Sequence, residues 1–206
     1  MNWRYDMKKY LLVLSAFLCL LLVSQEVGAY DFYGSGYKNT NATTGRHANP
    51  ALNGVVYNGT TYNFNTHYVN ARNRWNNATD VNVSSGTTGT IAIRSFHGDY
   101  GNNDLFGWAR MYKSDGTTVQ SCATCEPTAN WAYSDVYLNQ FHIHNDGEGG
   151  DPWSPMYIDG LATHEFGHAY GLAHEDDVES VMHSGNLYEG YLTPRPDDIS
   201  GMNALH

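Results

Sequence analysis

The chain has few cysteines, few positive charges and no long apolar run in its body. Its 206 residues include 3 cysteines, and 11 lysines and arginines stand against 21 aspartates and glutamates, for a formal net charge of −10. A surface of this sign disfavours nucleic acid and anionic membranes as partners, because both are negatively charged themselves. It suits a protein that binds cations, but it equally suits a solvated acidic surface, and charge alone does not choose between them.

The marked apolar run lies near the N-terminus, at Leu11–Val23, directly after Lys8 and Lys9. A membrane-spanning helix needs about 20 apolar residues, so this run is too short to span a bilayer comfortably. A basic start, an apolar centre and small residues ending at Ala29 are typical of a secretory signal peptide. We predict that residues 1–29 are a signal peptide cleaved after Ala29, that the mature protein is secreted, and that it has no membrane association after cleavage.

Cleavage there leaves Cys122 and Cys125 as the cysteines of the mature chain. In an oxidising compartment their spacing favours a local disulfide that pins a loop. The alternatives are a redox pair or a cysteine zinc site. A redox pair lacks its usual strand–helix flanks, and a four-cysteine zinc site lacks its second pair.

Residues 164–174 read His-Glu-Phe-Gly-His-Ala-Tyr-Gly-Leu-Ala-His. His164 and His168 are four residues apart, so on an α-helix they share one face and can bind one metal ion. Gly171 can end the helix with a positive φ at no steric cost, and the chain can then fold back to deliver His174 as a third ligand. Three protein ligands leave the fourth position open, which is typical of a catalytic zinc site.

Glu165 follows the first of these ligands, where its carboxylate can reach a zinc-activated water. Zinc lowers the pKa of bound water to about 7 and polarises a scissile carbonyl. We predict that Glu165 is the general base that takes the water's proton and the general acid that returns it to the leaving amine. Met182, in Ser-Val-Met-His, is expected to form an apolar floor beneath the ligands. A helix with incidentally placed histidines would explain neither Gly171 nor Met182.

On these residues the chain resembles the metzincin zinc metallopeptidases, and within them the matrixin-like branch, which includes the catalytic domains of matrix metalloproteinases. Residues 193–205 look like that branch's closing helix, and residues 91–99 look like a strand that runs into a cation-binding loop. The match spans most of residues 50–206. The resemblance implies a metzincin-type zinc peptidase domain with a catalytic Zn²⁺ and with protein or peptide substrates.

The sequence also departs from the matrixin pattern. Glu175 follows His174, as in astacin-like members, where matrixins usually carry serine. Ser184 lies two residues after Met182, so a tyrosine that would help to hold the transition state, as in astacins, is not supported.

Further cation sites have weaker support in the sequence. His97 and Asp99 match the start of a matrixin structural zinc and calcium loop, but the histidine expected after that loop is absent. Ca²⁺ needs carboxylate and carbonyl oxygens. Acidic residues in Gly- or Asn-rich loops could supply them, although they could equally be solvated; they are Asp99, Asp104, Asp146, Glu148 and Asp151.

Hydrophobic patterning predicts an α+β fold with helices on one face of a sheet. The resemblance implies a twisted mixed sheet packed with an active-site helix and a C-terminal helix. Residues 30–50 are expected to be an irregular arm, and residues 51–206 the catalytic domain. Asn58-Gly59 indicates a hairpin within Val55–Phe64. Helices are expected at Thr66–Ala78, where Tyr68, Ala71 and Trp75 would face the core, at Tyr157–Tyr170, and from Pro196 onward.

Strands are expected at Thr90–Phe96, Leu105–Tyr112 and Asp135–Phe141. We expect Leu105–Tyr112 to be an exposed sheet edge that pairs with an extended substrate, although an ordinary interior strand remains the alternative. The sequence thus predicts a secreted, monomeric, zinc-dependent endopeptidase. Two alternatives stay open: an inactive metal- or peptide-binding module of the same fold, and a zinc hydrolase of non-peptide amides.

Overall fold

A five-stranded sheet forms the base of the molecule in the computed structural model, which describes residues 30–206 apart from 50–53, 121–125, 148–149 and 186–189. The strand order is β4-β1-β5-β7-β6. β4, β1, β5 and β7 run parallel to one another, whereas β6 pairs with β7 in the antiparallel sense. The strands are β1 (Arg46–Ala48), β4 (Ser84–Ser85), β5 (Ile91–Gly98), β6 (Gly107–Tyr112) and β7 (Tyr133–Asn139).

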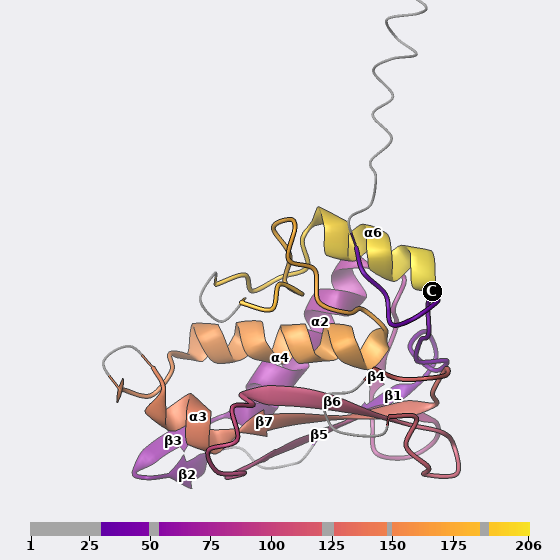
Figure 1. The fold of residues 1–206 in the computed structure, drawn as a ribbon. Helices are drawn as coiled ribbons and strands as arrows, with labels where there is room; N and C mark the ends of the chain where they lie inside the picture. The colour runs from indigo at the N-terminus through magenta and orange to yellow at the C-terminus, as the bar shows by residue number, and fades with distance from the viewer. Residues whose placement is uncertain (1–29, 50–53, 121–125, 148–149, 186–189) are drawn as a thin grey trace, which may run out of the picture.

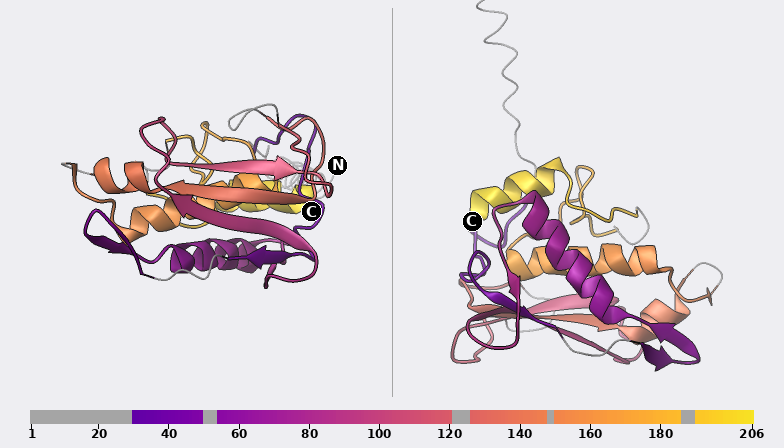
Figure 2. Two further views of the ribbon diagram at one scale, coloured as in Figure 1. Left: turned by 90° about the horizontal axis from the view of Figure 1, so that it is seen from below. Right: turned by 180° about the vertical axis from the view of Figure 1, so that it is seen from behind.

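Two long helices, α2 (Phe64–Ala78) and α4 (Pro155–Tyr170), cover one face of this sheet (Figure 1). The view from below shows the strands in front of α4, with α2 to one side (Figure 2). α6 (Pro196–Leu205) lies on the far side of α4 from the sheet, and the short helix α3 (Gln140–Asn145) follows β7. A mixed sheet with helices on one face agrees with the predicted α+β architecture.

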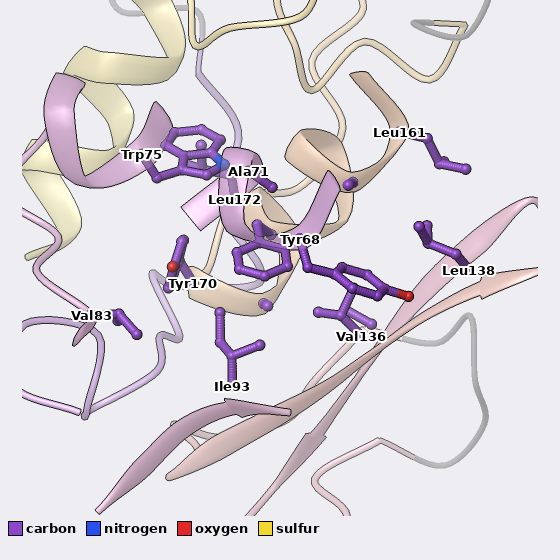
Figure 3. Close-up of a cluster of buried hydrophobic side chains, with 14 of the residues drawn as sticks. Tyr68, Ala71, Trp75, Val83, Ile93, Val136, Leu138, Leu161, Tyr170 and Leu172 are labelled. Atoms are coloured by element: carbon purple, nitrogen blue, oxygen red, sulfur yellow. The ribbon is translucent and has the colours of Figure 1, made fainter. Parts of the chain in front are cut away.

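The core lies between the sheet and the two long helices (Figure 3). Tyr68, Ala71 and Trp75 of α2 are fully buried, as their helical spacing predicts. Burying a large apolar side chain contributes about 1.5–3 kcal/mol, so these positions tie α2 firmly to its neighbours. The Trp75 indole N–H also donates to the Thr163 carbonyl at 2.8 Å, which fixes α2 against α4.

The C-terminal end of α4 is anchored to the sheet through one carbonyl. The Ala169 oxygen accepts hydrogen bonds from Trp131 Nε1 at 3.1 Å, Ser134 Oγ at 2.9 Å and Asn39 Nδ2 at 3.3 Å. Carbonyls in the last turn of a helix lack intrahelical partners, so these donors satisfy a group that would otherwise be buried unpaired. Gly171 then ends the helix at φ 142°, as predicted, in a conformation that side chains rarely adopt.

Two expectations about secondary structure were wrong. Within the arm 30–50, predicted to be irregular, Arg46–Ala48 forms β1, which lies inside the sheet between β4 and β5. The strand predicted at Asp135–Phe141 ends at Asn139, because the Asn139 side chain accepts from the Phe141 N–H at 3.2 Å and starts α3. Pairing with strands distant in the sequence forms β1, whereas a local side-chain cap ends β7.

The other predicted elements are present within a few residues of their expected bounds. The hairpin consists of β2 (Val55–Tyr57) and β3 (Thr60–Tyr62), with Asn58 and Gly59 at positive φ in its turn. No helix among the described residues has both the length and the apolar character needed to cross a bilayer. The predicted signal peptide, Cys122, Cys125 and Glu148 lie outside the described residues.

Candidate metal centre

Three histidine side chains converge at the C-terminal half of α4. His164 and His168 project from one face of the helix, and the chain that turns at Gly171 brings His174 back to them. His174 Nε2 lies 3.2 Å from the Nε2 atoms of both His164 and His168. An ion about 2.0–2.1 Å from each nitrogen in tetrahedral geometry would set the nitrogens about 3.3 Å apart. The spacing therefore fits one zinc ion.

This is also the single group of three or more candidate ligands that the described part of the chain brings together. Among the described residues, His97 and Asp99 belong to no group of three candidate ligands. The His97 ring stacks on Phe64 at 4.6 Å, and the Asp99 carboxylate accepts from the Tyr57 hydroxyl at 2.8 Å. The described acidic loop residues Asp104, Asp146 and Asp151 form no such group either. The structural cation sites considered from the sequence gain no support.

Backbone carbonyls orient two of the three rings. Nδ1 of His164 donates to the Val181 oxygen at 2.8 Å, and Nδ1 of His168 donates to the Leu172 oxygen at 2.8 Å. A carbonyl accepts only, so the proton lies on Nδ1 in each ring and the lone pair lies on Nε2. Both rings thus present the nitrogen that points to the common centre.

Burial keeps these histidines neutral, which a metal ligand requires. Burial, followed by the neighbouring His174, lowers the pKa of His164 to about 4. Burial and the other two histidines hold the pKa of His168 well below its ordinary value, and burial also lowers the pKa of the more exposed His174. At neutral pH all three rings therefore have an available lone pair.

Glu165 is 4% exposed and faces the edge strand β6. Burial raises the pKa of its carboxyl to about 8, and its Oε2 atom has no hydrogen-bond partner. A buried carboxylate oxygen without a partner is costly, and such atoms often mark a water or ion that the protein binds. The orphaned oxygen beside the three nitrogens fits a cation with its bound water.

Met182 is 1% exposed and lies against Gly167, the residue before the ligand His168. The turn that contains it is held by Asp198 of α6. The Asp198 carboxylate accepts from Val181 N at 2.9 Å, Ser180 Oγ at 2.5 Å and Arg195 N at 2.7 Å. Because Val181 also binds His164, Asp198 supports a ligand indirectly.

The metal centre opens on a cleft along β6, with hollows of about 200 and 370 Å³. Leu105, Gly107, His164, Glu165 and His174 line both hollows. β6 is an outer strand of the sheet, as predicted for Leu105–Tyr112.

Part of this edge is already paired. Met111 directs its backbone away from β7, with its N–H donating to Gln120 Oε1 at 2.8 Å and its oxygen accepting from Val119 N at 3.0 Å. Alternate residues of a strand point their backbone groups the same way, so Gly107 and Ala109 direct theirs into the cleft.

Two residues of the N-terminal arm, Asp31 and Tyr33, line the larger hollow beside His168 and His174. Nothing in their sequence marked them, since they lie far from the motif along the chain. Ser184, which stands where an astacin-like tyrosine would be, also lines the cleft, but its hydroxyl donates to Asp176 Oδ2 at 3.0 Å.

Comparison with known proteins identifies the family of this chain. The family model described as Matrixin, of the peptidase M10 group, matches residues 57–206. The chain belongs to the matrixin family. Membership supports a zinc metallopeptidase in general terms. The match agrees with the resemblance to matrixins that the sequence motif indicated.

Named relatives of this matrixin are distant. Interstitial collagenase of Bos taurus is 25% identical over 134 residues, which cover 64% of this chain and 26% of the relative. Matrix metalloproteinase-20 of Homo sapiens is 30% identical over 129 residues, covering 61% of this chain and 23% of the relative. The chain thus spans about a quarter of the length of the relatives it matches.

A solved structure described as the GM1-bound form of the ECX AB5 holotoxin superposes with a TM-score of 0.54 at 16% identity. The superposition covers 86% of this chain and 88% of that one. At this identity the likeness concerns the fold alone.

Proposed function

We propose that this protein is a secreted zinc endopeptidase whose ion is held by His164, His168 and His174. The observation that carries the proposal is the convergence of three Nε2 atoms beside the buried, unpaired carboxylate of Glu165. Three ligands leave an open coordination position, which a purely structural zinc site would fill with a fourth. The metzincin-type fold belongs to the same proposal, supported by the matrixin match and the order of the elements.

Glu165 moves the protons of the reaction. When bound, zinc supplies a Lewis acid that lowers the pKa of water and polarises the scissile carbonyl. The Glu165 carboxylate takes a proton from the attacking water and returns it to the leaving amine. Burial alone would keep this carboxyl protonated near neutral pH, and the charge of a nearby cation opposes that effect because it favours the carboxylate.

The substrate lies along β6 in an extended conformation. An extended peptide has unpaired N–H and C=O groups, and the outward backbone groups of Gly107 and Ala109 can pair with them. Met111 is already paired with Val119 and Gln120, so pairing with a substrate is confined to the part of the edge nearest Glu165. Pairing with that part of β6 would bring the scissile bond beside the metal centre.

Residues 1–29 act as the signal peptide and residues 51–206 as the catalytic domain, to which the preceding arm contributes β1. We propose that the enzyme works as a monomer; one chain supplies all three ligands, so a single copy can form the metal centre.

The proposal is tested by digesting a peptide library with the mature protein and identifying the new termini by mass spectrometry. We expect internal cleavage that stops with a zinc chelator, and a loss of about 100-fold or more in Glu165→Gln with zinc retained. Glu179→Gln is the matched control, because Glu179 is an exposed carboxylate paired with Arg195.

Peptide binding without cleavage would indicate an inactive binding module. Hydrolysis of small amides alone would indicate a hydrolase of non-peptide substrates. Either result overturns the endopeptidase assignment.

A further inference from the structure

The N-terminal arm reaches the metal centre through Tyr33. Its hydroxyl oxygen lies 2.9 Å from Nδ1 of His168, although the two residues are 135 positions apart in the sequence. The Tyr33 ring packs beside the His168 ring at 5.8 Å and meets Trp131 edge-on at 6.4 Å. The hydroxyl is therefore held against the ligand by packing on two sides.

Backbone pairing fixes the segment that carries this side chain. Phe32 forms an antiparallel bridge with Leu172, and Ala173 N–H donates to the Asp31 oxygen at 2.9 Å. Leu172 and Ala173 belong to the short connection between the second and third histidines. The arm is therefore hydrogen-bonded to the connection that determines the position of His174.

The chemistry of the contact follows from the tautomer. A His168 ring that presents Nε2 to an ion carries its proton on Nδ1. That proton has two acceptors, the Leu172 oxygen at 2.8 Å and the Tyr33 oxygen at 2.9 Å. Two acceptors for one N–H resist rotation of the ring, since a rotation that moves the N–H away from an acceptor weakens that hydrogen bond. The O–H of Tyr33 then remains free to donate into the hollow that Tyr33 and Glu165 both line.

We propose that Tyr33 is a positioning residue that orients His168 for zinc, so that the N-terminal arm completes the metal centre. The inference rests on the proposed function, because it takes His168 as a zinc ligand. It adds a residue that lies outside the His-Glu-x-x-His motif and outside the matched residues 57–206.

The test compares Tyr33→Phe, which keeps the ring and removes the hydroxyl, with Tyr37→Phe in the same arm. Tyr37 packs beside Gly34 rather than on a ligand. The zinc dissociation constant is measured by competition with a chromophoric chelator, and the visible absorption of the Co²⁺ form reports the ligand geometry. We expect about tenfold weaker zinc binding and an altered Co²⁺ spectrum in Tyr33→Phe only, since outer partners of ligating histidines contribute about 10–100-fold in affinity.

Zinc affinity and a Co²⁺ spectrum equal to those of the unaltered protein would overturn the proposal. A thermal melt of the metal-free variant shows whether the fold is intact. If Tyr33→Phe does not fold, the nuclear Overhauser effect between the two rings decides on the unaltered zinc-loaded protein; its presence supports the contact and its absence rejects it. If the unaltered protein binds no zinc at the three histidines, the proposed function is refuted. That result differs from normal zinc binding in Tyr33→Phe, which refutes only the role of Tyr33.

Discussion

Gly107 faces Glu165 so closely that no side chain fits between them. A Cβ at Gly107 would lie 2.9 Å from both Cγ and Oε1 of Glu165, and 3.0 Å from the Tyr137 oxygen. The glycine on the edge strand is therefore what leaves room for the proposed general base.

Replacing Gly107 with alanine should displace the Glu165 carboxylate without removing a zinc ligand. A misplacement of about 1 Å can cost about 100-fold in rate, so we expect a loss of that order in kcat/KM with zinc content unchanged. Steady-state peptide cleavage and elemental analysis of the same sample make the measurement. Normal turnover in Gly107→Ala would show that Glu165 does not need its present position.

Gly167 and Met182 form a second close contact. A Cβ at Gly167 would lie 2.2 Å from Met182 Sδ and 2.9 Å from Trp75 Cζ2. Gly167→Ala should destabilise the fold by about 1–3 kcal/mol through overpacking. Shortening Met182 to alanine in the same chain should recover part of this loss, because the two changes are coupled. Denaturant unfolding of the two single variants and the double variant measures the coupling, and strictly additive free energies would contradict the contact.

Asp198 should matter for zinc although it touches no ligand. Asp198→Ala leaves the buried N–H of Val181 and the hydroxyl of Ser180 without their acceptor, at about 1–3 kcal/mol for each such group. We expect reduced stability and weaker zinc binding, since Val181 orients His164. The neighbouring Asp197→Ala is the control in the first turn of the same helix. Equal effects of the two substitutions would reject a specific role for Asp198.

His47 should make the fold sensitive to acid. It is fully buried in β1, its Nε2 lies 2.6 Å from Ser95 Oγ, and burial followed by the Arg72 charge lowers its pKa from 6.5 to about 3. Between these two values the unfolded chain binds the extra proton. The stability that His47 contributes is therefore complete above about pH 6.5 and is lost as the pH falls toward 3, at up to about 1.4 kcal/mol per pH unit.

The free energy of unfolding across this window, compared between the unaltered protein and His47→Gln, isolates this residue from the other histidines. The unaltered protein should show the steeper slope. Equal slopes would show that His47 does not titrate in the way that its burial implies.

The helix and the histidine cluster could be predicted because their information is local. The spacing from His164 to His174 and the glycine between them specify a helix, its end and the return of the chain. The pattern of α2 was equally readable, since its buried residues recur at helical steps.

The supports of the site could not be predicted in this way. β1 has three residues and gains its stability from parallel neighbours distant in the sequence. Tyr33 and Asp198 act on the centre through contacts made only after the chain has folded. From the sequence alone Tyr33 is a tyrosine in an irregular arm and Asp198 is an acidic residue in the first turn of a helix. The sequence does not show which residues they contact.

In the proposed function, one zinc ion at the three histidines enables peptide hydrolysis. The most direct measurement adds zinc stepwise to metal-free protein and counts new peptide amino termini at each step. We expect no cleavage without metal. The number of new amino termini should rise linearly with added zinc and level off at about one zinc per chain, a level that His168→Ala does not reach. Full cleavage by the metal-free protein, or one tightly bound zinc per chain without cleavage of any peptide, would contradict it.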